Sequence, residues 1–303
     1  MDKSITVLLS TYNGEKYLTE QIDSLMIQKG VDLHVLIRDD GSTDATIKII
    51  QNYCNRDERV HFIQGSNVGA GQSFFDLIRR SSDTEFYAFC DQDDVWDADK
   101  LFCALKMIGD CDTDIPVLYH SNLRIVDEQL GMIRNAHENP IDESLKYSCL
   151  ARNAVTGCTS VFNLAAKKMI QEHIPTENIL HDGWIYMVCK IFGKVYYDFK
   201  PHISYRQHAG NVVGMHKTTL SGYLSRIRRF VVKQQQPRYE RALLFQKYYW
   251  EFMMEEDQQK LLEILEYKKS LRNRLRLLFD TDIREQTPKG DLRYRILIIR
   301  GGI

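Results

Sequence analysis

The chain lacks any long apolar run, and nothing in it approaches the ~18 consecutive apolar residues of a membrane-spanning helix. It also shows no secretory leader at its start, because Met1–Ser4 leads straight into a five-residue apolar segment, shorter than a leader's apolar region. The seven cysteines form no Cys-x-x-Cys pair and no metal-binding spacing. These absences predict a cytoplasmic protein with reduced, mostly buried thiols.

The composition is that of an ordinary soluble globular protein, with 303 residues, 44% of them hydrophobic and 27% charged. This length permits one large domain or two smaller ones. A net charge of −1 conceals an asymmetry: residues 216–303 hold 19 Lys and Arg against 11 Asp and Glu, whereas residues 1–215 hold 21 against 30. The acidic body suits a cation-dependent site, and the basic tail suits either an anionic surface or a solvated helical face.

Apolar segments typical of strands alternate with helical segments through the first hundred residues. Strands are predicted at residues 5–9, 33–37, 60–63 and 86–90, and the segments between them carry apolar side chains at helical spacing. Such alternation predicts an α/β fold with a mostly parallel sheet and right-handed crossovers.

Each predicted strand ends in a polar or glycine-containing loop. The side chains that offer hydrogen-bonding or metal-binding groups there are Ser10, Asp40, Asn67, Asp91 and Asp93. Ligands of open α/β sheets collect at the carboxyl ends of the strands, and an Asp-x-Asp pair there is typical of Mg²⁺ or Mn²⁺ shared with phosphate. Asp40 is suited to accept the N3–H of a uracil or thymine ring, whereas Asp44 is predicted to cap the next helix.

Four motifs in this order resemble the family-2 glycosyltransferases with a GT-A fold. They are Val7–Asn13, Asp39–Asp44, Asn67–Gly69 and Asp91–Trp96. The resemblance is strong over residues 1–110 and weaker to about residue 215. The form Asp-Gln-Asp-Asp-Val-Trp, with Tyr205–His208 downstream, resembles the rhamnosyltransferase-like branch. The resemblance implies a catalytic domain over 1–215, with nucleotide-sugar binding in 1–110 and acceptor binding and catalysis in 111–215, followed by a basic helical region at 216–303.

The resemblance also implies roles for individual residues. It implies that Ser10 and Asp40 hold the pyrimidine nucleoside and that Asp91 contacts the ribose or the metal shell. Further candidates for binding the donor nucleotide are Tyr12, Asn67 and Arg206, of which Arg206 suits pairing with phosphate oxygens. The resemblance implies that Asp93 ligates the cation, Mn²⁺ or Mg²⁺, with Asp91 in the same shell. A neutral imidazole at His208 suits a further metal ligand or a contact with the diphosphate, and the alternative is a structural hydrogen bond. The processive polymer synthases of the family carry a Gln-x-x-Arg-Trp motif, which is absent here, so transfer of a single sugar is favoured.

The catalytic base that the resemblance implies is Asp182, within His181-Asp182-Gly183-Trp184. The alternative for Asp182 is an N-cap, because the residues that follow look helical, and His181 is a weaker candidate base. Branch relatives usually show an aromatic residue where Gly183 stands. Trp96 and Trp184 suit either sugar stacking or core packing.

The predicted function is inverting, metal-dependent, non-processive transfer of a sugar from a UDP- or dTDP-sugar to a glycan or lipid-linked saccharide in cell-surface polysaccharide biosynthesis. Rhamnose as the sugar depends on the resemblance alone. One alternative is a sugar-1-phosphate nucleotidyltransferase, which is disfavoured because Ser10–Gly14 lacks a glycine-rich phosphate loop with basic residues. Another is a nucleic-acid binder acting through the basic tail, which the acidic body disfavours.

Residues 216–303 are predicted to be helical, because apolar positions keep helical spacing at 220–231 and again over 238–279. The strongly basic stretch 268–276 suits docking on an anionic membrane, which would place the enzyme on the inner face of the plasma membrane. The favoured alternatives are a helical subdomain packed on the sheet or a homo-oligomer contact.

Overall fold

The structure is a computed structural model that describes residues 2–109, 113–208 and 237–303. The chain divides into two compact units: the first comprises Met1–Ser144 and Asn153–Arg206, and the second Leu145–Arg152 and Gln207–Ile303. The boundary predicted near residue 215 and the helix predicted at 220–231 lie outside the described residues.

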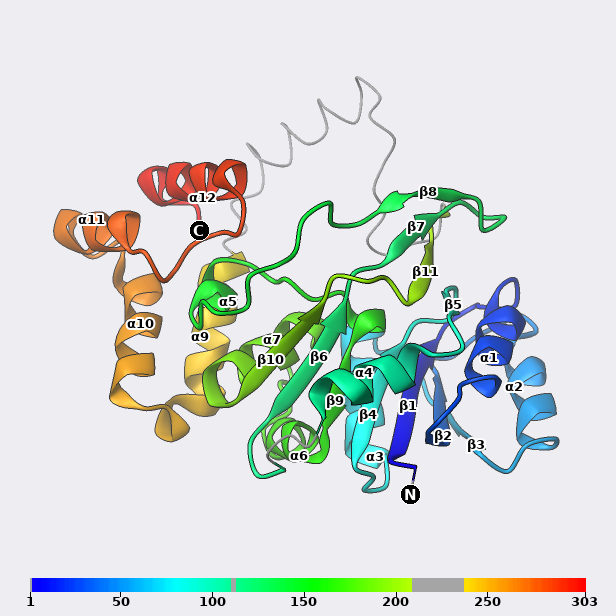
Figure 1. The fold of residues 1–303 in the computed structure, drawn as a ribbon. Helices are drawn as coiled ribbons and strands as arrows, with labels where there is room; N and C mark the ends of the chain where they lie inside the picture. The colour runs from blue at the N-terminus through cyan, green and yellow to red at the C-terminus, as the bar shows by residue number, and fades with distance from the viewer. Residues whose placement is uncertain (1, 110–112, 209–236) are drawn as a thin grey trace. The chain divides into compact units, whose positions relative to one another are not determined.

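The first unit is built on a seven-stranded sheet with the order β10-β6-β9-β4-β1-β2-β3 (Figure 1). Its strands are β1 (Ser4–Thr11), β2 (Asp32–Asp39), β3 (Val60–Gln64), β4 (Phe86–Cys90), β6 (Val117–Ser121), β9 (Val161–Asn163) and β10 (Lys194–Asp198). All neighbours pair in parallel except β9, which is antiparallel to both β4 and β6. The predicted mostly parallel sheet is therefore confirmed, and the four strands predicted from the sequence are β1 to β4.

Burial on both faces explains the mostly apolar sequence of β1, in which Thr6 is the one polar residue between Ile5 and Leu9 and is itself buried. Side chains alternate between the faces of a strand, and Ile5, Val7 and Leu9 join one hydrophobic core while Leu8 is equally buried on the other face. A strand covered on both sides has no solvent-facing position for a polar residue in its middle.

Helices cover both faces of this sheet (Figure 1). On one face lie α1 (Leu18–Met26), α2 (Thr46–Cys54) and α4 (Lys100–Ile108), whose apolar side chains join the core of Ile5 and Val7. On the other face α3 (Ala70–Arg80), α6 (Leu164–Glu172) and α7 (His181–Phe192) pack against one another. Trp96 and Trp184 are both buried, so these tryptophans belong to the core.

A second, four-stranded sheet in the first unit has the order β5-β11-β7-β8. Its strands are β5 (Val95–Trp96), β7 (Arg124–Val126), β8 (Met132–Asn135) and β11 (Ile203–Arg206). β5 follows the acidic quartet Asp91–Asp94 directly and pairs with β11 through Trp96 and Ile203. A segment more than 100 residues further along the chain therefore supports the loop that carries the acidic quartet.

The second unit is helical, which confirms the predicted C-terminal extension. Its elements are α5 (Ser148–Ala151), α9 (Pro237–Tyr249), the 3₁₀ turn η2 (Trp250–Phe252), α10 (Glu255–Glu266), α11 (Leu271–Phe279) and α12 (Pro288–Arg300). The long helical stretch predicted over 238–279 is thus three helices, and Ser270 caps the last of them by accepting the Asn273 N–H. Among the described residues, no helix has the length and apolar character needed to span a bilayer.

Candidate functional site

The carboxyl ends of β4, β1 and β2 are adjacent, so the loops that follow these strands meet at one edge of the sheet. Thr11 at the end of β1 pairs in register with Asp39, and its carbonyl accepts the Asp40 N–H at 2.8 Å. The Gln92 side chain ties the acidic loop to the same strand: it accepts from Thr11 Oγ1 at 2.6 Å and from the Tyr12 N–H at 2.8 Å. Residues predicted to bind the donor nucleotide therefore come from three separate loops and lie along one edge of the sheet.

Asp40 is buried at this edge and fixes the neighbouring loop. Its Oδ1 pairs with Arg38 Nη1 at 2.6 Å and accepts the Val68 N–H at 2.9 Å, while Oδ2 accepts the Gly69 N–H at 2.9 Å. Gly69 has a φ of +84°, a backbone conformation that glycine adopts without steric cost. Asn67 is exposed on the loop that Asp40 holds.

The other residues expected near the donor lie on the same loops. Ser10 Oγ and Ser73 Oγ share a hydrogen bond of 2.6 Å, and the Tyr12 side chain is exposed. Asp44 accepts the N–H of Thr46, the first residue of α2, at 3.0 Å. The N-cap position of α2 is nevertheless Ala45, which has no side-chain cap, so the prediction that Asp44 is the N-cap is wrong by one residue.

The acidic quartet is crowded and partly dehydrated. Burial, reinforced by the charges of Asp93 and Asp182, raises the pKa of Asp91 to about 7. Burial and the neighbouring charges of Asp93 and Asp91 also raise the pKa of Asp94 well above its ordinary range. Asp94 accepts the Arg206 N–H through Oδ1 at 3.2 Å, and its buried Oδ2 has no hydrogen-bond partner among the described residues. The arrangement concentrates negative charge at the end of β4.

Three potential ligand atoms meet in this cluster. One oxygen each of Asp91 and Asp94 and the sulfur of Cys158 lie within 4.8 Å of one another. Sequence reasoning gave no ligand role to Asp94, although it belongs to the quartet, and missed Cys158, which no local pattern marks. Cys158 belongs to η1 (Gly157–Thr159), which the fold brings beside β4.

Asp182 lies in the first turn of α7, and its charge acts on Asp91. The N-cap of α7 is Leu180, without a side-chain cap, so the capping alternative for Asp182 is wrong. The neighbouring His181 ring packs against Phe74 and Phe89, with centroids 3.8 and 4.5 Å away. Burial lowers the pKa of His181 to about 3, which makes it a poor proton acceptor.

Arg206 is buried and contacts the loop that carries the acidic quartet Asp91–Asp94. Its Nε donates to the Asp93 carbonyl at 3.0 Å, Nη1 donates to the Glu128 carbonyl, and Nη2 pairs with Glu20. These contacts position the backbone of the loop, and the expected contact of Arg206 with donor phosphate stays a prediction. His208 belongs to the second unit, and its role as a metal ligand also stays a prediction.

The comparisons with known proteins agree with this geometry. The family described as glycosyl transferase family 2 matches residues 6–172. The chain is 30% identical over 222 residues to dTDP-rhamnosyl transferase RfbG of Shigella flexneri, covering 68% of this chain and 73% of that protein. This similarity confirms the expected likeness to rhamnosyltransferases.

Solved structures show the same fold. Residues 1–349 of S. aureus TarS in complex with UDP-GlcNAc match with a TM-score of 0.58 at 17% identity, covering 99% of this chain and 91% of that one. Mannosyltransferase PcManGT from Pyrobaculum calidifontis, in complex with GDP-Man and Mn²⁺, matches with a TM-score of 0.52 at 15% identity, covering 100% and 87%. The expected GT-A fold is confirmed. With a family match over more than half of its length, the chain belongs to glycosyl transferase family 2 and is a glycosyltransferase.

Proposed function

We propose that this glycosyltransferase moves one sugar at a time, with inversion, from a UDP- or dTDP-sugar to a glycan or lipid-linked saccharide acceptor. The observation that carries the proposal is that the charges of Asp93 and Asp182 act on the buried Asp91. These carboxylates belong to the sheet edge where the loops after β1 and β2 also lie. The name of the Shigella relative supports dTDP-rhamnose as the first donor to test. In this proposal the product belongs to a cell-surface polysaccharide.

The donor nucleotide lies, in this proposal, across the ends of β1 and β2. Asp40 accepts the pyrimidine N3–H, and the exposed ring of Tyr12 lies against the base. Ser10 and Asn67 supply hydroxyl and amide groups from the flanking loops. Asp40 Oδ1 accepts from Arg38 and from the Val68 N–H, and Oδ2 accepts from the Gly69 N–H, which leaves an acceptor position on Oδ2 for a ring N–H.

The acidic quartet fits a divalent cation. Burial, with repulsion between neighbouring carboxylates, raises the pKa values of Asp91 and Asp94, and a bound cation would offset both effects. Asp94 Oδ2 is a buried oxygen without a hydrogen-bond partner in the described part of the chain. Asp93 and Asp91 would hold the ion, with Asp94 behind them. Mn²⁺ or Mg²⁺ supplies a Lewis acid for the departing diphosphate.

Asp182 acts as the general base. Its carboxylate takes the proton of the acceptor hydroxyl while the hydroxyl oxygen bonds to the anomeric carbon and the bond to the diphosphate breaks on the opposite face. One base and no covalent intermediate suffice for inversion. His181 stays neutral and packed beside it, which leaves Asp182 as the proton acceptor in the first turn of α7.

Asp182→Asn tests the assignment of the base. Removing a general base lowers kcat about 10²- to 10⁴-fold, while binding of the nucleotide sugar and Mn²⁺, measured by calorimetry, should stay close to wild type. Asp93→Ala should also abolish transfer, but it should weaken Mn²⁺-dependent donor binding as well. The matched control is Asp142→Asn, an exposed aspartate in the same unit, which should leave both quantities unchanged. Near-normal turnover of Asp182→Asn would show that another group is the base.

We also propose that the helical unit docks on an anionic membrane, where lipid-linked acceptors reside. α11 exposes Leu271, Leu275 and Phe279 at i, i+4 and i+8, with exposed fractions of 71%, 43% and 73%. α12 likewise exposes an apolar stripe consisting of Leu292, Ile296 and Ile299. Exposed arginines flank both stripes, namely Arg272, Arg276, Arg293 and Arg300. Apolar side chains with arginines beside them suit the interface of an anionic bilayer.

Vesicle flotation tests this docking. The full chain should float with vesicles that contain anionic lipid and much less with purely zwitterionic ones. The double variant Leu271→Glu/Phe279→Glu should lose flotation, whereas Ile27→Glu, at an exposed isoleucine of the first unit, should retain it. Equal flotation of wild type and double variant would exclude these helices as the anchor.

A further inference from the structure

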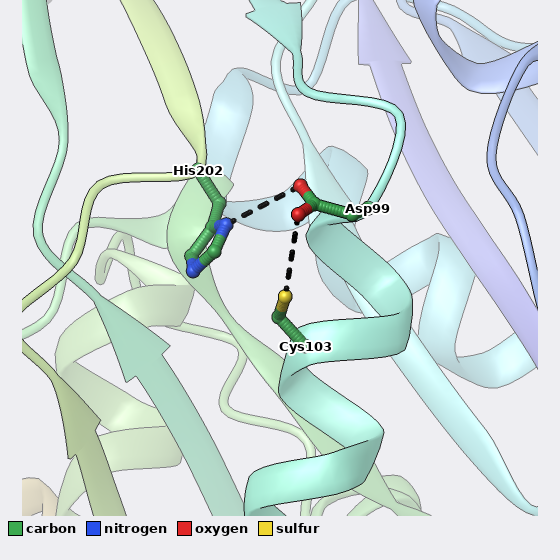
Figure 2. A group of neighbouring side chains, drawn as sticks. All are labelled: Asp99, Cys103 and His202. Carbon is green, nitrogen blue, oxygen red and sulfur yellow. Dashed lines mark hydrogen bonds and ion pairs between the residues drawn. The ribbon is translucent and has the colours of Figure 1, made fainter.

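A second group of potential ligands lies outside the acidic quartet. Asp99 at the N-cap position of α4, Cys103 one turn into this helix and His202 just before β11 face one another (Figure 2). His202 Nδ1 is 3.5 Å from Asp99 Oδ1, and Cys103 Sγ is 3.6 Å from Asp99 Oδ2. One ligand atom from each residue lies within 4.8 Å of the others. Imidazole, thiolate and carboxylate together are a donor set that Zn²⁺ prefers and Mg²⁺ does not.

The orientation of His202 is what separates this group from an ordinary hydrogen-bonded cluster. The side chain is 1% exposed, and its Nε2 lies 3.2 Å from Asp198 Oδ2. When a carboxylate accepts the Nε2–H, the neutral ring carries its lone pair on Nδ1. Nδ1 faces Asp99, whose Oδ1 lies at ion-pair distance, 3.5 Å away, and it makes no hydrogen bond of good geometry with any described residue. A carboxylate behind a buried imidazole is the arrangement found around metal-bound histidines.

We propose that Asp99, Cys103 and His202 bind a Zn²⁺ ion. Tetrahedral zinc with its usual bond lengths to nitrogen, sulfur and oxygen holds its ligand atoms about 3.3–3.6 Å apart. The distance of 3.5 Å from His202 Nδ1 to Asp99 Oδ1 and that of 3.6 Å from Cys103 Sγ to Asp99 Oδ2 lie in this range, and one ligand atom from each side chain lies within 4.8 Å of the others. The Asp99 side chain is 51% exposed, which gives the ion a route from solvent and leaves a fourth position for water. Binding displaces the Cys103 thiol proton to solvent, because the ligand is the thiolate.

The site would join two segments that support the acidic loop. Asp99 and Cys103 belong to the start of α4, and His202 precedes β11, which pairs with β5 directly after the acidic quartet. The Asp97 N–H donates to the His202 carbonyl at 3.0 Å in the same place. The zinc ion would hold these segments together and has no part in the transfer step.

Cobalt(II) titration of the full chain tests the proposal. Mg²⁺ in excess fills the acidic quartet, and Co²⁺ bound by a thiolate then produces a sulfur-to-cobalt charge-transfer band, which Zn²⁺ should abolish at one equivalent per chain. Cys103→Ser should remove the band and lower Zn²⁺ affinity at least about 10-fold. Cys54→Ser, at a partly buried cysteine of α2, is the matched control and should keep the band. Absence of the band in wild type, or its survival in Cys103→Ser, would overturn the proposal.

Asp198→Asn separates metal binding from simple packing. This variant retains all three ligands but removes the carboxylate behind His202, so Zn²⁺ affinity should fall about 10- to 100-fold. Zn²⁺ should also raise the Tm of wild type and leave the Tm of Cys103→Ser unchanged. An equal Tm response of both proteins to Zn²⁺ would mean that the ion binds elsewhere. None of these readouts depends on glycosyl transfer.

Discussion

The buried ion pair between Arg38 and Asp40 stabilises the loops of the predicted nucleotide pocket. The substitution Arg38→Met should therefore lower the free energy of unfolding. Both side chains are 4% exposed, and Arg38 Nη1 lies 2.6 Å from Asp40 Oδ1. The same guanidinium pairs with Asp76 through Nε at 2.9 Å and donates to Ser73 Oγ at 3.0 Å. Methionine keeps most of the aliphatic stem but leaves the Asp40 charge without its cation.

The expected loss of stability is large. Removing one partner of a buried ion pair costs about 3–5 kcal/mol, because the remaining charge stays buried and uncompensated. Since 1 kcal/mol shifts the Tm of a domain of this size by about 2–4 °C, the Tm should fall by roughly 6–20 °C. Circular dichroism during thermal and urea denaturation measures both quantities.

Two further variants make the test specific. Arg38→Met/Asp40→Asn removes both charges and should recover part of the lost stability, because no unpaired ion remains. Arg80→Met breaks an ion pair of 3.0 Å with Asp76 in which the arginine is 56% exposed. This control should cost about 1 kcal/mol or less. If Arg38→Met were no more destabilising than Arg80→Met, the reasoning about the buried pair would be refuted.

Two further changes follow from packing and charge. Burial opposes ionisation of Glu143, but His120 at 3.1 Å and Lys190 at 3.1 Å outweigh it and hold the pKa of Glu143 below its ordinary 4.5. The ionised form therefore stabilises the fold above pH 4.5, and this stability is lost as the pH falls through the lowered pKa; Glu143→Gln should lower stability at pH 7 and flatten the acid side of a urea-derived stability curve. In Gly193→Ala the new Cβ would lie 1.7 Å from the Pro116 carbonyl oxygen, so the turn into β10 must shift. A wild-type Tm for this variant would contradict the packing.

The parallel half of the sheet could be predicted because its signals are local. β1 to β4 appear as apolar runs that end in polar loops, and the parallel topology brings those loops to one edge. The strand β9 was missed because it has only three residues, and its antiparallel insertion between β4 and β6 depends on pairing partners distant in sequence.

In the candidate site, too, some features could be predicted from local sequence and others depend on residues distant in the chain. The positions of Asp40 and Asp91 followed from their strands, whereas the burial of His181 against Phe74 and Phe89 depends on α7 meeting α3 and β4 in the fold. The sequence predicts that Arg206 pairs with phosphate oxygens of the donor nucleotide. In the structure its guanidinium is occupied by Glu20 and two carbonyl groups.

The sequence by itself determined the alternation of strands and helices, the family, and the loops that gather at one edge of the sheet. These features are recorded in short stretches of the chain, as periodicity and as the chemistry at strand ends. Only the tertiary structure decided that Cys158 joins Asp91 and that His202 meets Cys103. Residues that far apart become neighbours through the packing of the whole core, which no local pattern contains.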